Sequence, residues 1–298
     1  MLFLACLVLY VQFADRSEAI SEAHSASSKL VYPKEVLVME ITDVLVTGGT
    51  GRLGTRLAER LRAGGLRPRV MSRSGRPGTV KGNLLTGEGL REAVDGTDAI
   101  IHAAQSPTRK TRETFVRGTE RLLRAAEEAD VSHVLYPSIV GIERIPLAYY
   151  EAKLESERVV ERSLAPWTIL RATQFHDLIL GIIRPLARFP LVAPVPKGLL
   201  FQPMDAGEVA DRLIELTLSG PAGRVPDVGG PEVKTLAELA SAYLRVTGAQ
   251  KRILELPLPG KAARALREGA QIDLDSAWGT VTWGEFLRRQ LVDAQGGR

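Results

Sequence analysis

Two kinds of apolar pattern alternate between Met39 and about residue 175. Short runs rich in Val, Ile and Leu are separated by longer stretches whose apolar residues recur at helical spacing. Strands that alternate with amphipathic helices imply parallel βαβ units, so we expect an α/β fold with a doubly wound parallel sheet. The predicted strands are 44–47, 68–72, a short strand ending near 82–85, 98–104, 134–138 and 167–171, and the predicted helices begin after Gly51 and cover about 88–94, 114–129 and 149–163.

The pattern changes beyond about residue 175. Five prolines between residues 185 and 203 interrupt any long element, which predicts a loop-rich segment. Three pairs with the spacing of a capping box then precede apolar helical runs. We therefore expect a sheet domain over residues 39–175 and a small, mostly helical substrate lobe over 176–298, whose chain can cross back to the sheet. The capping pairs are Asp205 with Glu208, Thr235 with Glu238, and Thr282 with Glu285.

A glycine-rich turn follows the first predicted strand. Gly48, Gly51 and Gly54 have the spacing G-x-x-G-x-x-G, and an amphipathic helix follows them. Such glycines allow a tight turn, a close approach of the backbone to a pyrophosphate, and close packing of helix on strand. The helix N-terminus offers free N–H groups to the phosphates. This context predicts a Rossmann-type dinucleotide site with contacts from Gly48, Thr50, Gly51, Arg52, Leu53 and Gly54.

The residues after the second strand indicate which dinucleotide binds. A cofactor without a 2′-phosphate usually meets an acidic residue about 20 residues after the glycines. No Asp or Glu occurs between Glu59 and Glu88, whereas seven Arg or Lys residues lie in that interval. A guanidinium binds phosphate oxygens through two parallel N–H groups. We therefore predict NADP(H), with Arg73 as the first candidate for the 2′-phosphate and Arg76 as the second.

Composition and charge exclude several other classes of function. Hydrophobic residues make up 45% of the chain and charged residues 25%, as in ordinary globular proteins, and the net charge is +4. Basic residues are spread along the chain without an interleaved aromatic stripe, so we expect no nucleic-acid partner. A single cysteine excludes an internal disulfide, and the four histidines lack ligand spacing, so we predict no metal site. We expect a small-molecule substrate and a monomer or homodimer.

The first 38 residues differ from the rest of the chain. Residues 1–13 form an apolar run that is too short to span a bilayer, and no Lys or Arg precedes it. Because Met39 stands directly before the first strand, we interpret residues 1–38 as a disordered upstream extension or a misassigned start. A membrane anchor or export signal is the alternative. Since NADPH is intracellular, we expect a cytoplasmic protein without stable membrane association.

One helix carries a candidate catalytic pair. Tyr149 and Lys153 are four residues apart and so share a helix face. A tyrosine is a poor acid or base near neutral pH because its ordinary pKa is about 10, and a neighbouring ammonium lowers that pKa by favouring the phenolate. Ser138 ends the preceding strand, where it can hold a carbonyl in line with the phenol. A surface contact is the alternative for the pair, and Tyr150 is an alternative phenol.

Taken together, these residues resemble the short-chain dehydrogenase/reductase superfamily, specifically its atypical branch with NmrA-like and sugar-epimerase-like members. The resemblance covers residues 39–298 and rests on the turn T-G-G-T-G-R-L-G and on the set of Ser138, Tyr149 and Lys153. Three further segments resemble family motifs: a strand ending in two alanines beside the cofactor, a helix motif, and the signature of the sixth strand. These segments are Asp98–Ala104, Val116–Thr119 and Ile169–Phe175.

The resemblance implies a role for each of these positions. Tyr149 would be the general acid/base, Lys153 would bind the nicotinamide ribose and tune Tyr149, and Ser138 would orient the substrate. Small residues at the end of the fourth strand leave room for the cofactor, and the sixth strand ends near the nicotinamide. The further cofactor contacts are Ala103, Ala104, Thr173 and Gln174, with Asn83 at a position where many members carry an aspartate beside the adenine, and its neighbour Leu84.

Three functions are compatible with these residues. The first is an NADP(H)-dependent oxidoreductase that transfers a hydride to or from a small, apolar carbonyl or quinone-like substrate. The second is a non-catalytic NADP(H)-binding redox sensor, and the third is a sugar-nucleotide epimerase. An epimerase needs a polar, phosphate-binding lobe, whereas residues 186–203 carry only Arg188 and Lys197 as charged side chains. This composition favours a small apolar substrate.

Overall fold

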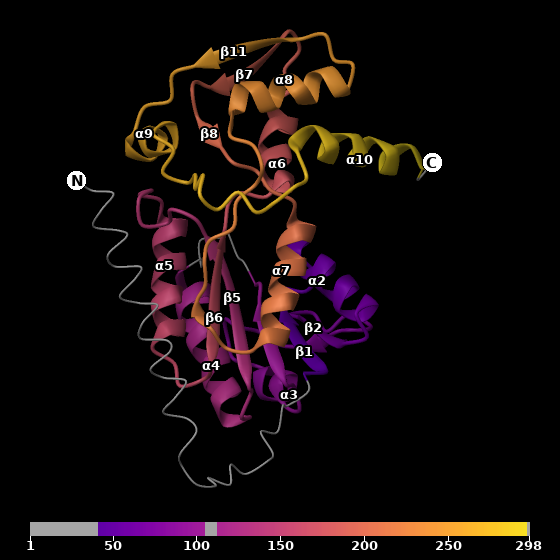
Figure 1. The fold of residues 1–298 in the computed structure, drawn as a ribbon, viewed down its shortest axis with the longest axis vertical. Helices are drawn as coiled ribbons and strands as arrows, with labels where there is room; N and C mark the ends of the chain where they lie inside the picture. Colours follow the sequence, from indigo (N-terminus) through magenta and orange to yellow (C-terminus); the bar gives the residue numbers. More distant parts are fainter. Residues whose placement is uncertain (1–40, 105–111, 297–298) are drawn as a thin grey trace, which may run out of the picture. The chain divides into compact units, whose positions relative to one another are not determined.

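A parallel sheet of seven strands forms the centre of the protein, in the order β3-β2-β1-β4-β5-β6-β9 (Figure 1). The structure is a computed structural model that describes residues 41–104 and 112–296. The interpretation of residues 1–38, with a start at Met39, lies outside the described residues. The strands of the sheet are β1 (Asp43–Thr47), β2 (Arg67–Ser72), β3 (Val80–Lys81), β4 (Ala99–His102), β5 (His133–Ile139), β6 (Trp167–Ala172) and β9 (Gly223–Arg224).

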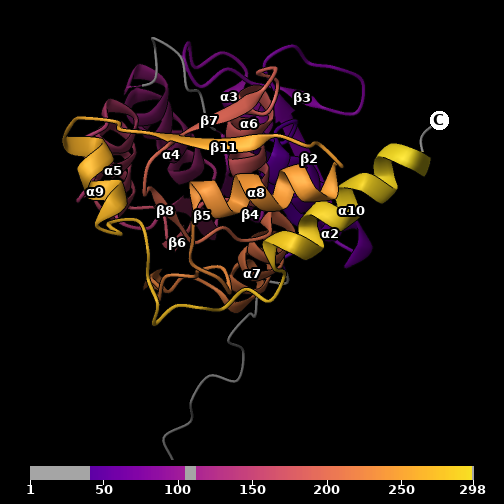
Figure 2. The same ribbon diagram turned by 90° about the horizontal axis from the view of Figure 1, so that it is seen from above.

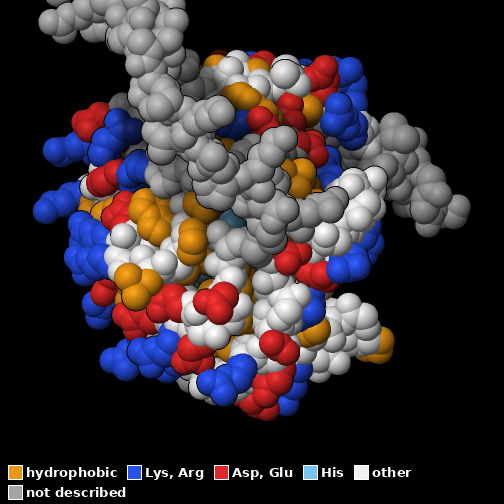
Figure 3. Space-filling view, turned by 60° about the horizontal axis from the view of Figure 1, so that its bottom comes forward, with side chains coloured by type: hydrophobic (Ala, Val, Ile, Leu, Met, Phe, Trp, Pro, Cys, Tyr) orange, Lys and Arg blue, Asp and Glu red, His pale blue; other side chains and the backbone are white. Residues whose placement is uncertain are grey.

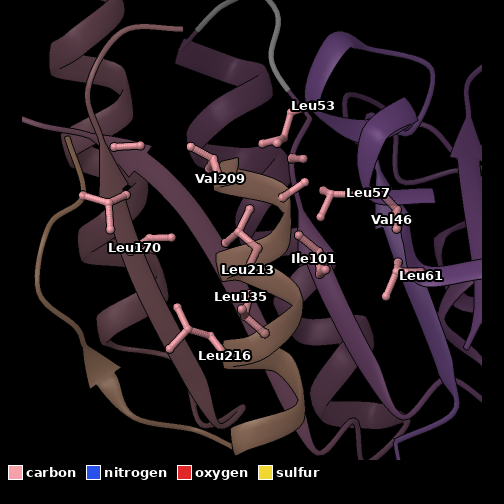
Figure 4. Packing of buried hydrophobic residues seen from close by; sticks show 14 of the residues in the cluster. Val46, Leu53, Leu57, Leu61, Ile101, Leu135, Leu170, Val209, Leu213 and Leu216 are labelled. Carbon is pink, nitrogen blue, oxygen red and sulfur yellow. The ribbon is translucent and has the colours of Figure 1, made fainter. Parts of the chain in front are cut away.

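Helices cover both faces of this sheet, as the sequence pattern predicts. Successive residues of a strand point to opposite faces, and both faces of β1 are buried. Val46 packs in one cluster with Leu57 and Leu213 (Figure 4). Leu45 packs in a second cluster with Leu122. The first cluster joins α2 (Arg52–Ala63) and α7 (Ala206–Ser219) to the sheet, and the second joins α3 (Leu90–Val94), α4 (Gly118–Glu128) and α5 (Ala148–Glu161). The doubly wound Rossmann arrangement is therefore confirmed.

The predicted helix over 114–129 has an irregular start. It consists of a π-helical turn, η1 (Glu113–Arg117), followed directly by α4. A π-helical turn widens the backbone spiral by one residue per turn and often lies beside a functional site. The third strand is also shifted from its prediction, because β3 ends at Lys81 and Gly82 bonds back to Ser72 through its N–H.

The remaining elements form a lobe around a separate apolar cluster. Ile183, Val195, Leu239 and Trp283 are among its buried members. Although they belong to the C-terminal half of the chain, α7 and β9 lie on the central sheet. None of the helices in the described ranges is long and apolar enough to cross a bilayer. The elements of the lobe are α6 (His176–Leu186), β7 (Val192–Pro196), β8 (Leu200–Phe201), β10 (Lys234–Thr235), α8 (Leu236–Val246), β11 (Arg252–Leu256), α9 (Lys261–Arg267) and α10 (Trp283–Gly296).

The segment with the five prolines, expected to be loop-rich, contains the end of a helix and two short strands. Helix α6 contains Pro185 in its last turn and ends one residue later, because the proline lacks the N–H that would continue the helical bonding. Strand β7 contains Pro194 and Pro196, yet it pairs with β11 along its whole length. Lys197 donates its N–H to Leu256. Since alternate residues of a strand bond to the same neighbour, the two prolines occupy positions whose N–H would point away from β11.

The three capping pairs behave differently. Thr235 and Glu238 form a reciprocal capping box at the start of α8, and Thr282 does the same with its partner at the start of α10. Asp205 caps α7, but Glu208 does not bond back to it. The Glu208 carboxylate instead accepts hydrogen bonds from the N–H and the hydroxyl of Thr280, and these bonds hold a loop of the lobe against α7.

Candidate active site

A cavity of about 840 Å³ opens at the carboxyl ends of the central strands. Ligands of open parallel sheets bind at this edge, where the strand order reverses. The loops after β1, β2, β4, β5 and β6 all contribute to its wall. The structure therefore brings together most of the predicted site residues, whereas Arg76 and Lys153 do not line the cavity. The predicted residues that line it are Gly48, Thr50, Gly51, Arg52, Leu53, Gly54, Arg73, Asn83, Leu84, Ala103, Ala104, Ser138, Tyr149, Thr173 and Gln174.

The glycine turn forms a cradle that larger residues would fill. Gly48 has a φ of +65°, and a Cβ added there would lie 2.6 Å from the Cα of Ala104. A Cβ on Gly54 would lie 2.3 Å from the carbonyl oxygen of Gly48. Helix α2 begins after Gly51 with no side-chain cap and no acidic residue in its first turn. Its first N–H groups are thus available to a phosphate.

The end of β2 offers a basic and hydroxyl-rich corner of the cavity. Arg73 is exposed there, and Ser72 lines the cavity next to it. The Ser72 hydroxyl lies 3.3 Å from the hydroxyls of both Ser74 and Thr79. Arg76 lies further along this turn, where its carbonyl accepts two hydrogen bonds from Thr79. Sequence reasoning missed Ser72, although it occupies the strand end where an acidic residue would mark the other cofactor.

These features fit a dinucleotide that carries a 2′-phosphate. None of the described residues that line the cavity is acidic, and its two charged side chains are Arg52 and Arg73. Asn83 also lines the cavity, and its side-chain amide oxygen accepts the N–H of Leu85 at 3.0 Å. A phosphate in such an environment meets donors and positive charge without a repelling carboxylate.

Ser138 and Tyr149 meet in this cavity from different elements. The Ser138 hydroxyl, at the end of β5, is buried and has no hydrogen-bond partner among the described residues. A buried polar group without a partner costs free energy, which a bound ligand would recover. Tyr149 and Tyr150 begin α5 and both line the cavity. The ring of Tyr149 makes an edge contact with Phe115 from η1, at a centroid distance of 5.4 Å.

The expected lowering of the Tyr149 pKa by Lys153 is not found in this structure. Burial, with a smaller contribution from Tyr150, raises the pKa of Tyr149 to about 12. Lys153 is fully buried instead, and its ammonium donates to the carbonyl of Pro137 at 2.6 Å. It also lies 3.9 Å from the ring centroid of Tyr136. The lysine thus connects α5 to the end of β5, which carries Ser138. The i,i+4 spacing of Tyr149 and Lys153 did not reveal that the lysine side chain points toward this strand.

Burial of Lys153 changes its acidity. Loss of solvation lowers the pKa of Lys153 to about 7, against a smaller opposing effect of Glu157. Burial likewise lowers the pKa of the neighbouring His102 to about 3. His102 is held between the hydroxyls of Thr47 and Thr119, at 2.7 and 3.0 Å. An uncharged imidazole therefore lies under the cavity.

A buried ion pair fixes α5 on the sheet and was missed by sequence reasoning. Arg171 of β6 donates to both carboxylate oxygens of Glu157 and also pairs with the half-exposed Glu143. Both partners of the first pair are almost wholly excluded from solvent. The three residues lie on separate elements, so no spacing in the sequence joins them. The pair holds the helix whose first turn carries Tyr149.

Thr173 and Gln174 line the cavity at the end of β6, and their polar groups bond to the lobe. The Thr173 hydroxyl accepts the N–H of Gly230 at 3.2 Å. The side chain of Gln174 accepts the N–H of Gln202 and donates to the carbonyl of Gln271, at 3.2 and 3.1 Å. These bonds join the lobe to the sheet beside the cavity, and the direct contacts of both residues with the cofactor stay a prediction.

The wall contributed by the lobe and the adjacent strand ends is apolar. Ile139 follows the serine at the end of β5, and Phe175 and Leu178 lead into α6. Leu178 is half exposed at the mouth of the cavity. The sequence had placed Phe175 only at the end of a family motif and had not singled out Ile139 or Leu178, although the apolar composition of 186–203 indicated the character of the lobe. A ligand that contacts this wall gains from burying apolar surface.

Comparison with known proteins places this site in a wider context. Residues 48–178 match the NAD(P)H-binding family. The chain is 31% identical over 232 residues to the (4-alkanoyl-5-oxo-2,5-dihydrofuran-3-yl)methyl phosphate reductase of Streptomyces griseus, a match that covers 72% of this chain and 77% of the relative. It is 22% identical over 215 residues to quinone oxidoreductase 2 of Escherichia coli, over 70% of this chain and 75% of that protein.

A solved structure shares the fold. The NADPH-dependent quinone oxidoreductase from Escherichia coli, complexed with NADPH, superposes with a TM-score of 0.69 at 17% sequence identity. The match covers 83% of this chain and 99% of that one. At this identity the likeness shows the architecture, and the roles of individual residues have to be argued from the site itself.

Proposed function

We propose that this chain, which belongs to the NAD(P)H-binding family and is an NAD(P)H-dependent oxidoreductase, uses NADPH to reduce a small, apolar carbonyl or quinone-like substrate. One observation carries the proposal: the buried, unpartnered hydroxyl of Ser138 lines the same cavity as Tyr149 and the uncapped start of α2. A proton donor, a carbonyl-binding hydroxyl and a phosphate cradle thus share one enclosed space.

The choice of NADPH rests on the corner at the end of β2. Arg73 and Ser72 both line the cavity there, and the serine stands where an acidic residue would favour NADH. The guanidinium and the hydroxyls around it provide donors to a 2′-phosphate. Arg73 is therefore the principal determinant, and Arg76, outside the cavity wall, contributes less.

The side chains at the reacting end divide the chemistry between them. A bound NADPH supplies the hydride. Ser138 donates a hydrogen bond to the carbonyl oxygen of the substrate, which stabilises the negative charge that develops on it. Tyr149 then donates its phenolic proton to this oxygen. Because burial raises its pKa to about 12, the phenol is protonated throughout the neutral range and is ready to act as an acid.

The substrate class follows from the apolar wall and from the relatives. The names of the two relatives from Streptomyces griseus and Escherichia coli indicate a dihydrofuranone phosphate and a quinone as their substrates, and both are carbonyl compounds. Ile139, Phe175 and Leu178 would contact the hydrocarbon part of such a molecule. A sugar nucleotide, by contrast, would leave many polar groups without partners against this wall.

The test measures NADPH and NADH oxidation with a panel of quinones, aldehydes and ketones. We expect turnover with NADPH and at least one of these substrates. Ser138→Ala should lower kcat about 100- to 1,000-fold, because one donor to the developing oxyanion is removed, while the Kd for NADPH stays unchanged. Tight NADPH binding with no turnover on any of the substrates would contradict the proposal and favour the redox sensor.

A further inference from the structure

The lobe carries a two-stranded sheet whose outer face is apolar. Strands β7 and β11 are parallel, with Leu254 opposite Pro194 and Leu256 opposite Pro196. Viewed from above, the two strands run side by side across the top of the lobe (Figure 2). Residues Ile253 and Glu255 alternate with the two leucines and line a small cleft with α8. The leucines therefore point to the opposite, solvent side of the sheet.

Large apolar side chains are exposed on this sheet and in the segments that flank its two strands. Leu254 and Leu256 are each 45% exposed, and the neighbouring Leu258 is 43% exposed. Just before β7, Phe189 is 52% and Leu191 82% exposed. These five residues, here called the lobe patch, are five of the twelve exposed large hydrophobic residues of the described chain. A concentration of this kind marks an interaction surface, whereas single exposed leucines are ordinary.

The two segments that carry the lobe patch are rich in basic residues. The Lys251 ammonium donates to the carbonyl of Phe189 at 2.8 Å, and Arg267 donates to the carbonyl of Leu258 at 3.0 Å. Arg252 shares a strand face with Leu254. The two segments that carry the patch, 184–198 and 249–267, contain eight basic residues and one acidic residue. These are Arg184, Arg188, Lys197, Lys251, Arg252, Lys261, Arg264 and Arg267, with Glu255 as the acidic one.

The one acidic residue of these two segments lies away from the lobe patch. The single carboxylate, Glu255, lies on the α8 side of the sheet, away from the patch. Figure 3 views the molecule from the end that lies away from the lobe, and on this face acidic and basic side chains are interspersed. The whole chain has a net charge of only +4. The patch therefore combines exposed apolar side chains with a local excess of positive charge.

The nature of the partner follows from this combination. A second copy of the chain would bring two strongly basic surfaces together, and like charges repel. An anionic phospholipid bilayer attracts the same basic residues and accepts apolar side chains at the level of its headgroups. We propose that the lobe patch docks the protein reversibly on an anionic membrane surface. This peripheral contact does not involve the catalytic cavity. Because it is reversible, it agrees with the expectation from the sequence that the protein has no stable membrane association.

Vesicle sedimentation of the full chain tests the proposal. Vesicles of phosphatidylcholine alone are compared with vesicles that contain about 30% phosphatidylglycerol, at low and at physiological salt. We expect at least about tenfold stronger binding to the anionic vesicles, weakened by salt. The double variant Leu254→Ser and Leu256→Ser should lower that binding at least about fivefold. A second variant, Lys197→Glu with Arg252→Glu, should lower it as well.

Matched controls separate this surface from other sources of binding. Leu164→Ser and Leu274→Ser remove exposed leucines elsewhere and should bind vesicles like the wild type. Equal binding of all variants would overturn the proposal, since it would locate the contact outside the patch. Absence of vesicle binding by the wild type would also overturn the proposal. A dimer that is seen by light scattering and is lost in the variant Leu254→Ser with Leu256→Ser would instead assign the lobe patch to a second copy of the chain. NADPH binding and turnover with a water-soluble quinone should be unchanged in the variants, so this result is independent of the proposed catalytic function.

Discussion

Replacement of Lys153 by methionine should remove a pH dependence of folding stability. In the folded protein burial lowers the pKa of Lys153 to about 7, from an ordinary value of 10.5. As the pH falls from about 10.5 to about 7, the unfolded chain therefore binds a proton that the folded chain does not bind. The free energy of unfolding falls across this window, and below about pH 7 the loss is complete. The neighbouring His102 and Tyr149 titrate outside this window, near pH 3 and 12.

The size of this effect follows from the two pKa values. Their full difference corresponds to about 5 kcal/mol, of which about 3 kcal/mol develops between about pH 9.5 and about pH 7. The aromatic ring of Tyr136, at 3.9 Å from the ammonium, favours the charged form by about 1 kcal/mol. About 2 kcal/mol then remains over the same interval. We therefore expect the stability difference between Lys153→Met and the wild type to change by about 2 kcal/mol between these pH values, with the variant relatively more stable at the lower pH.

Urea unfolding followed by tryptophan fluorescence measures this difference at constant ionic strength. Comparing the two proteins at each pH cancels the titration of groups that they share. Lys197→Met serves as the control, because it removes an exposed lysine whose ammonium stays in water. Parallel curves of stability against pH for Lys153→Met and the wild type would refute the reasoning, since they would mean that the buried amine titrates alike in both states.

Two further substitutions test the cofactor corner and the support of α5. Arg73→Asp should weaken NADPH binding about 10- to 100-fold by removing a charge-assisted bond, with NADH binding nearly unchanged. Arg76→Asp should have a much smaller effect in the same fluorescence titration, and an equal effect would move the phosphate site. Glu157→Gln should destabilise the fold by about 3 kcal/mol because it leaves a buried guanidinium underpaired, whereas Glu143→Gln, at the half-exposed partner, should cost under about 1 kcal/mol in urea unfolding.

The sheet and its glycine turn could be predicted because each depends on local pattern. Apolar runs that alternate with helical periodicity predict a doubly wound sheet. The spacing of Gly48, Gly51 and Gly54 predicts the turn, in which Gly48 and Gly54 leave no room for a Cβ. Helix α6 was not predicted, because the sequence shows Pro185 but not its place in the last turn. In β7, the position of the prolines relative to β11 depends on a partner strand about 60 residues away in the sequence.

Side-chain direction accounts for most of what the sequence could not reveal about the site. The i,i+4 spacing places Tyr149 and Lys153 on one helix face, but the strand beneath decides where the lysine points. Contact with the Pro137 carbonyl and the Tyr136 ring draws the ammonium away from the cavity wall. The ion pair of Arg171 with Glu157 joins β6 to α5. It could not be predicted from the sequence, because it forms only when the helix packs against the strand.

The most direct test of the proposed catalysis compares two neighbouring phenols. The rate of NADPH oxidation with the best substrate of the panel is measured for the wild type, Tyr149→Phe and Tyr150→Phe, together with the Kd for NADPH. We expect Tyr149→Phe to lower kcat about 100- to 10,000-fold, since the general acid is lost, with the Kd for NADPH unchanged, and Tyr150→Phe to keep most of the activity. Full activity of Tyr149→Phe, with or without a loss in Tyr150→Phe, would contradict the assignment of Tyr149 as the acid.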